Sequence, residues 1–157
     1  MHNWVQNLNI AISSIQVPFI KGGAQLMTEG LKNALLSNGH NVEIITIPFK
    51  FFPQKDIQKN IEIWKNQDFQ NFSGYSIDKL ISLQFPAYYA NHPNKTIWLM
   101  HQHRAVYDLY NSNNTNTQLE ELKSIIIAND KEELIKHNSI YSMSKNISNR
   151  LKKYNNI

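Results

Sequence analysis

Short apolar runs of strand length alternate along this chain with longer segments in which apolar residues recur every three or four positions. The apolar runs cover residues 8–15, 42–47, 78–85, 96–100 and 139–143, and each is short enough to be one buried strand. Met27, Leu31 and Leu35 lie along one face of a helix that begins at residue 24, and helical spacing returns at residues 56–64, 118–137 and 145–154. The pattern therefore predicts five strands and four helices.

The alternation of strands and helices predicts the fold class. Strands at this spacing need crossover connections, so the sheet should be mainly parallel. We expect an α/β, Rossmann-like three-layer sandwich with helices on both faces of the sheet. Asn38-Gly39 supplies a left-handed stop for the first helix. A chain of 157 residues is long enough for one such domain and too short for two ordinary ones, so residues 1–157 should form a single domain.

Composition narrows the function classes mainly by exclusion. The chain has no cysteine, which removes disulfides and thiolate metal sites and fits a reducing cytosol. No apolar run approaches the roughly 20 residues that cross a bilayer, and MHNWVQNLN lacks the basic region and apolar block of a signal peptide. We therefore expect a cytoplasmic protein.

The formal net charge of +4 favours anionic partners, whether phosphorylated metabolites, nucleic acid or an acidic lipid surface. Nucleic acid is the least expected, because the chain has no interleaved array of basic and aromatic residues. Peripheral contact with the inner membrane face is a further expectation, through the basic cluster Lys145, Arg150, Lys152 and Lys153.

Glycines and unusual polar residues follow four of the five predicted strands. In an open parallel sheet, ligands bind beyond the carboxyl ends of the strands, where the strand order reverses. The convergence of these residues at one edge is our site hypothesis. The residues are Gly22, Gly23, Gln84, His101, His103, Arg104 and Ser144.

The Gly22-Gly23 pair opens the first predicted helix. Glycines there let the backbone approach a phosphate, and free N–H groups and the helix dipole attract it. The alternative is that the pair only permits a tight turn. A nicotinamide-binding fold would need G-x-G-x-x-G after the first strand and an acidic residue ending the second. The loop QVPFIKGG has too few glycines and the second strand ends in Thr46-Ile47-Pro48, which argues against a dinucleotide dehydrogenase.

His101 and His103 end the fourth predicted strand, in TIWLMHQHR. If the strand continued through both, their imidazoles would point to one side and could share a metal. A site needs three or four ligands, however, and the other histidines are not at ligand spacing, so we expect no metal. His101 leaves the strand first, where an imidazole can hydrogen-bond a substrate hydroxyl, and it is the catalytic candidate. His103 is either a supporting residue or purely structural.

Several segments taken together resemble a known family. The glycine loop, LSNGHNVEIITI, DKLISLQFP, TIWLMHQHRAVYDLY and ANDKEELIKHNSIYSMSKNISNRLKKYNNI follow the order of the N-terminal domain of a family 4 (group 1) retaining glycosyltransferase with the GT-B fold. The likeness covers nearly the whole chain. Its more specific parts are HQHR-x-x-YDLY and the S-x-x-x-x-x-R-L segment that begins at Ser144.

The resemblance implies two Rossmann-like domains that face each other across a cleft, the first holding the acceptor and the second the nucleotide-sugar. Gly22 and Gly23 would then lie against the donor phosphates, His101 would line the reacting side of the cleft, and Ser144 matches a serine at the cleft edge. Gln84 departs from the pattern, since many relatives carry histidine there. The implied co-substrates are a UDP- or GDP-linked sugar and a sugar or glycoconjugate acceptor in surface polysaccharide synthesis, without cofactor or metal.

The family's second domain carries paired glutamates and basic residues that hold the diphosphate, and the chain stops at KYNNI before any counterpart. We therefore expect an acceptor-side half that is inactive alone, because nothing would stabilise the charge on the leaving diphosphate. The alternative is a non-catalytic Rossmann-like binding or partner module with the same fold. A third hypothesis, a metal-dependent hydrolase using His101 and His103, would require a bound metal.

Overall fold

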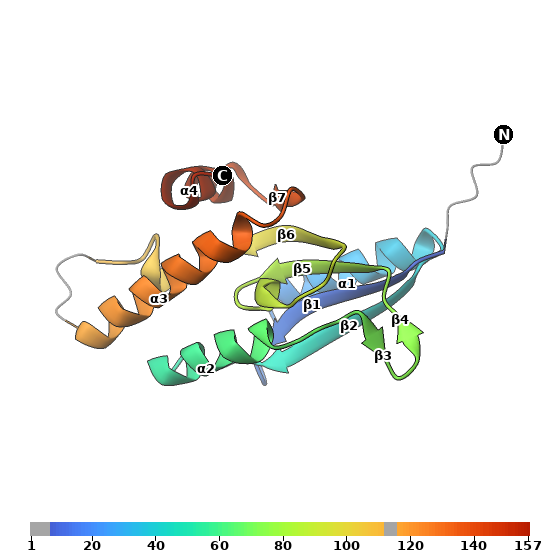
Figure 1. The fold of residues 1–157 in the computed structure, drawn as a ribbon, viewed down its shortest axis with the longest axis horizontal. Helices are drawn as coiled ribbons and strands as arrows, with labels where there is room; N and C mark the ends of the chain where they lie inside the picture. The colour runs from blue at the N-terminus through green and yellow to red at the C-terminus, as the bar shows by residue number, and fades with distance from the viewer. Residues whose placement is uncertain (1–6, 112–115) are drawn as a thin grey trace.

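The computed structural model describes residues 7–111 and 116–157 (Figure 1). Most of the segment on which the absence of a signal peptide was predicted lies outside the described residues, so that prediction rests on the sequence. In the described part of the chain, no helix combines the length and the apolar character needed to span a bilayer.

The main sheet contains the five predicted strands, all parallel, in the order β2-β1-β5-β6-β7. The strands are β1 (Asn9–Gln16), β2 (Asn41–Pro48), β5 (Lys79–Gln84), β6 (Lys95–His101) and β7 (Ile140–Ser142). The α-helices of the described residues are α1 (Gly23–Ser37), α2 (Gln54–Lys65), α3 (Thr117–Leu134) and α4 (Lys145–Asn155). The predicted α/β, Rossmann-like class is confirmed.

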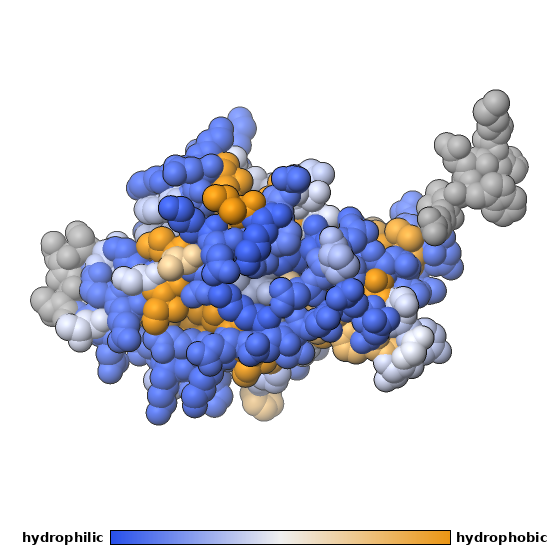
Figure 2. All heavy atoms as spheres, viewed as in Figure 1, coloured by the Kyte–Doolittle hydropathy of each residue, from blue (hydrophilic) through white to orange (hydrophobic). Residues whose placement is uncertain are grey.

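Side chains of β1 alternate between the two faces of the sheet. Ile10 and Ile12 join a small core against α1, which contributes Met27, Leu31 and Leu35. Ala11 and Ile15 join a larger core on the other face, against α2, α3 and α4. Figure 1 shows α1 behind the sheet and α2 and α3 in front of it. Figure 2 shows that the outer surfaces of these front helices are mostly hydrophilic, as amphipathic helices require.

Turns and short elements complete the fold. Helix α1 ends at the predicted Asn38-Gly39 stop, where Gly39 has a left-handed φ of +86°. A hairpin of β3 (Asn71–Phe72) and β4 (Tyr75–Ser76) was not predicted, although its tight turn at Ser73-Gly74, with φ values of 47° and 89°, is a typical hairpin signal. Two 3-10 helices, η1 (Ala87–Tyr89) and η2 (Arg104–Val106), follow β5 and β6.

The strand order reverses between β1 and β5. The chain passes from β1 to β2 on one side, and then returns to place β5, β6 and β7 in succession on the other side. Because all these strands are parallel, their carboxyl ends meet at one edge, and the crevice at the reversal is where ligands bind in open α/β sheets.

Candidate functional site

Three neighbouring strands bring polar side chains to the carboxyl edge of the sheet. Gln84 ends β5, pairs in register with His101 at the end of β6, and donates a hydrogen bond from Nε2 to Ser14 Oγ on β1 at 3.2 Å. Ser14 and Gln84 are buried and His101 is half-buried. These three residues, which we call the polar rim, run across the point where the strand order reverses.

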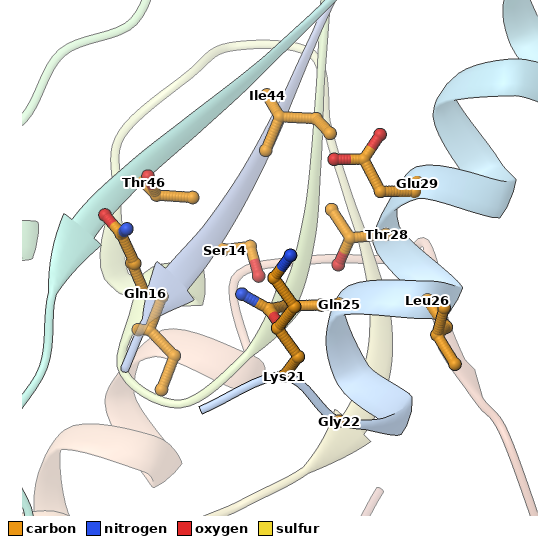
Figure 3. Close-up of a pocket in the computed structure, with 11 residues that line it drawn as sticks. Ser14, Gln16, Lys21, Gly22, Gln25, Leu26, Thr28, Glu29, Ile44 and Thr46 are labelled. Atoms are coloured by element: carbon orange, nitrogen blue, oxygen red, sulfur yellow. The ribbon is translucent and has the colours of Figure 1, made fainter. Parts of the chain in front are cut away.

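A cavity of about 590 Å³ opens at the ends of β1 and β2, beside the start of α1 (Figure 3). Its lining includes Gly22, Lys21, Gln25 and Ser14 of the polar rim. Figure 3 shows Lys21 and Gln25 reaching toward the end of β1, whereas Leu26 points away from it. We call this space the glycine cavity.

The two glycines are not required by their own backbone conformation. Gly22 has a φ of −146°, which any residue adopts, and a Cβ added at Gly22 or Gly23 would meet no atom of the described residues within 4 Å. A Cβ at either position would project into open space, at the end of α1 where the first N–H groups have no partner inside the helix. With the ammonium of Lys21 nearby, this arrangement is suited to an anion.

A second cavity, of about 680 Å³, lies between the end of β6 and the start of α4. It brings together three of the predicted site residues, His101, Arg104 and Ser144. Arg150 and Lys153 of α4 also line it. We call this space the histidine cavity. Among the described residues, it shares no lining residue with the glycine cavity, and the buried Gln84 connects Ser14 in one with the strand position of His101 in the other.

The imidazole of His101 is neutral at physiological pH. Burial lowers its pKa below the ordinary 6.5, the hydrogen bond with the Gln102 carbonyl opposes this, and the positive charges of nearby arginines lower it further. Nδ1 lies 3.2 Å from the Gln102 carbonyl oxygen, which can only accept, so the proton belongs on Nδ1. Nε2 is then an acceptor that can take a hydrogen bond from a hydroxyl group.

His103 is placed differently from His101. Strand β6 ends at His101, so the two residues do not continue one strand, and the side chain of His103 is buried with its ring centroid 5.0 Å from that of Phe85. Burial and the proximity of His101 lower the pKa of His103 to about 4. His103 thus packs against Phe85, a residue of the larger core. Among the described residues, no group of three or more His, Cys, Asp or Glu could hold a metal ion.

A buried carboxylate that the sequence analysis missed supports the end of β6. Asp130 of α3 is fully buried, and burial raises its pKa, an effect that four hydrogen-bond donors oppose. The donors are Tyr88 Oη at 2.6 Å, Tyr89 Oη at 2.5 Å, Tyr107 Oη at 2.6 Å and Gln102 Nε2 at 3.0 Å. Because Gln102 directly follows His101, its hydrogen bond to Asp130 ties the catalytic candidate to α3.

Comparison with known proteins adds no relative. No protein-family model matches the chain, and no curated protein matches it either. The resemblance to a glycosyltransferase domain therefore stays a prediction from the sequence.

Proposed function

We propose that this chain is the acceptor-side domain of a retaining glycosyltransferase, which moves a sugar from a UDP- or GDP-linked donor to a hydroxyl group of a sugar or glycoconjugate. The observation that carries the proposal is the polar rim. It crosses the reversal of strand order and connects a cavity suited to an anion with a cavity that offers a neutral imidazole. A nucleotide-sugar has a diphosphate next to its reacting carbon, so both features would be used together.

Each side of the rim would serve one part of the reaction. The donor diphosphate would approach the N–H groups opened by Gly22 and Gly23, with Lys21 as a counter-charge. His101 Nε2 would accept a hydrogen bond from a sugar hydroxyl and hold the reacting carbon in position. The acceptor oxygen would form its bond to the anomeric carbon on the face from which the diphosphate departs, and the hydroxyl proton would pass to the leaving diphosphate oxygen.

The leaving diphosphate needs more positive charge than this chain offers. Among the described residues that line the glycine cavity, Lys21 is the only cation, and Glu29 opposes it. Charge that develops on a leaving group must be stabilised by groups already in place. We infer that a donor-side domain supplies them, and that the 157-residue chain alone transfers no sugar.

The test is a transfer assay with the protein expressed from its complete coding region. The protein is incubated with a panel of UDP- and GDP-sugars and simple acceptors, and released nucleoside diphosphate and the anomer of the product are measured. We expect release with at least one donor, retention of configuration, and no release by the isolated chain. Inversion, or sugar transfer by the isolated chain, would overturn the proposal.

A non-catalytic binding module is the second candidate function. It is favoured by the observation that the two cavities share no lining residue among the described residues. It predicts ligand binding without turnover. The coding sequence beyond Ile157 discriminates the two candidates: a second βα domain with paired glutamates supports the transferase, and an immediate stop supports the module. Cytoplasmic location and peripheral membrane contact through the exposed lysines 145, 152 and 153 stay predictions.

A further inference from the structure

The histidine cavity is strongly basic. Of the described residues that line it, Arg104, Arg150 and Lys153 carry positive charge and Asp108 carries negative charge, which leaves two positive charges in excess. The charges of Arg104 and Arg150 reach His101 closely enough to lower its pKa, so both cations act on the same space. A recess lined in this way attracts anions.

Helix α4 begins at this cavity. Ser144 is its N-cap residue, and the first turn contains no acidic side chain. The Ser144 hydroxyl accepts a hydrogen bond from the N–H of Ile147, which leaves the earlier N–H groups of Lys145 and Asn146 without a partner inside the helix. These groups and the helix dipole favour an anion at the same place.

The guanidinium of Arg150 gives independent support. Its side chain is 8% exposed, and it holds Asp108 with two nitrogens, Nε to Oδ1 at 2.7 Å and Nη2 to Oδ2. The remaining nitrogen, Nη1, is buried and has no hydrogen-bond partner in the described part of the chain, although Arg150 lines the cavity. A buried charged donor without an acceptor is costly, and an anion oxygen in the cavity would supply the acceptor.

We infer that the histidine cavity binds a phosphate monoester. Its oxygens would be held by Arg150 Nη1 and by the N–H groups of Lys145 and Asn146, with Arg104 and Lys153 balancing the remaining charge. A phosphate monoester fits better than a carboxylate, because it carries nearly two negative charges near neutral pH and three acceptor oxygens. The site is separate from the glycine cavity, so this phosphate is not the donor diphosphate.

Only the identity of the ligand rests on the proposed function. If the chain is the acceptor domain of a glycosyltransferase, the phosphate monoester belongs to the acceptor, which is then a phosphorylated sugar or a lipid-linked sugar phosphate. Binding of the anion itself does not require transfer. It is therefore measured on the 157-residue chain, without any donor.

The experiment is an NMR titration of the ¹⁵N-labelled chain at fixed neutral pH and ionic strength, with glucose 6-phosphate, inorganic phosphate and glucose as probes. Glucose 6-phosphate should shift the amide signals of Lys145 and Asn146 and the Nε–H signal of Arg150 in a saturable way, and glucose should not. Equal affinity for inorganic phosphate would mean that the phosphate group alone is recognised. An affinity about tenfold higher for the sugar phosphate would mean that the cavity also holds the ring.

Exposed variants keep the test independent of folding. Arg104→Gln and Lys153→Gln should each weaken binding of glucose 6-phosphate by about two- to fivefold, as expected for exposed charges. Lys152→Gln is the matched control, because Lys152 neighbours Lys153 on α4 but does not line the cavity. Arg150→Lys keeps the charge but loses the planar fork, and should weaken binding more than either exposed variant.

Three results would overturn the inference: no saturable shift, shifts confined to Gly22 and Gly23, or an equal loss of affinity in Lys152→Gln. None of these outcomes tests the transferase proposal, which is tested by the transfer assay described above. Conversely, phosphate binding without any sugar transfer by the complete protein would remove the transferase proposal and leave the anion site in place.

Discussion

Glu133 on α3 is the centre of a buried cluster of charges, and its replacement tests how the helix is held to the sheet. Its side chain is 6% exposed, pairs with Lys95 at the start of β6, and lies 2.9 Å from His137 Nε2. The Lys95 side chain is 1% exposed, and its Nζ also donates to two backbone carbonyl oxygens at and just after η1, at 2.7 and 2.9 Å. The cluster therefore ties α3 to β6 and to η1.

The pKa values give the size of the effect. Burial alone would raise the pKa of Glu133, but hydrogen bonds from His137 and Lys95 lower it to about 2, against an ordinary value of 4.5. For Lys95 the balance is opposite, because burial is the larger effect and lowers its pKa. Because the Glu133 carboxylate titrates in the acidic range, its shift sets the contribution of this cluster to the pH dependence of stability there. The difference between 4.5 and about 2 corresponds to about 3 kcal/mol of unfolding free energy.

Glu133→Gln should therefore lower the unfolding free energy by about 3 kcal/mol near neutral pH, because the amide leaves the buried ammonium of Lys95 without a counter-charge. For a chain of this size, the melting temperature should fall by about 6–12 °C. Glu132→Gln is the matched control: Glu132 is the preceding residue, exposed and paired with Lys65 and Lys136, and its replacement should leave the melting temperature unchanged within error.

The assay is urea denaturation followed by tryptophan fluorescence, repeated from neutral pH down to about pH 2. A carboxylate with a lowered pKa stabilises the folded state above its unfolded pKa, and that contribution is lost as the pH falls through the folded pKa. The gap between wild type and Glu133→Gln should thus shrink between about pH 4.5 and 2. The reasoning fails if the gap at neutral pH is below about 1 kcal/mol, or if it does not depend on pH in this window.

Three further predictions concern backbone conformation and the catalytic candidate, His101. Phe19 is fully exposed and has a left-handed φ of 66°, which strains the backbone of a residue with a Cβ. Phe19→Gly should therefore raise the unfolding free energy by about 1 kcal/mol in urea denaturation, and a lower unfolding free energy would contradict this backbone strain. Gly39→Ala, at a φ of +86°, should cost about 1–2 kcal/mol in the same assay, whereas Gly22→Ala, at −146° in open space, should change stability little; equal effects would contradict this. NMR titration of His101 should give a pKa below 6.5, since burial disfavours the imidazolium, and a value above 6.5 would remove its assignment as a neutral hydrogen-bond acceptor.

Hydrophobic periodicity was enough to predict the main elements and the parallel sheet, because buried strands and amphipathic helices differ in period. It was less exact at element ends. The helix predicted to reach residue 137 ends at Leu134, where Lys136 and His137 turn their N–H groups to carbonyls three residues back. Tertiary packing selects such endings, so the apolar pattern does not indicate them.

The edge at which the site residues lie followed from the alternation of elements, but their grouping did not. His101 and His103 look equivalent in sequence, and only the turn into η2 places one in a cavity and the other against Phe85. The contact of Gln84 with Ser14 joins residues 70 positions apart, which no local pattern reports. Asp130 lies in a polar stretch of α3 that reads as solvent-exposed, and three tyrosines from other segments bury it.

Sugar transfer by the protein from its complete coding region, carrying His101→Ala, decides whether the polar rim is a reaction site. His40→Ala is the control, because His40 lies at the opposite edge of the sheet, where its Nδ1 accepts a hydrogen bond from the N–H of Leu8 at 3.4 Å. We predict that His101→Ala lowers turnover by about 10²-fold, the size expected for loss of substrate positioning, while the denaturation midpoint stays close to wild type, and that His40→Ala remains active. Turnover near the wild-type rate in His101→Ala would contradict the account.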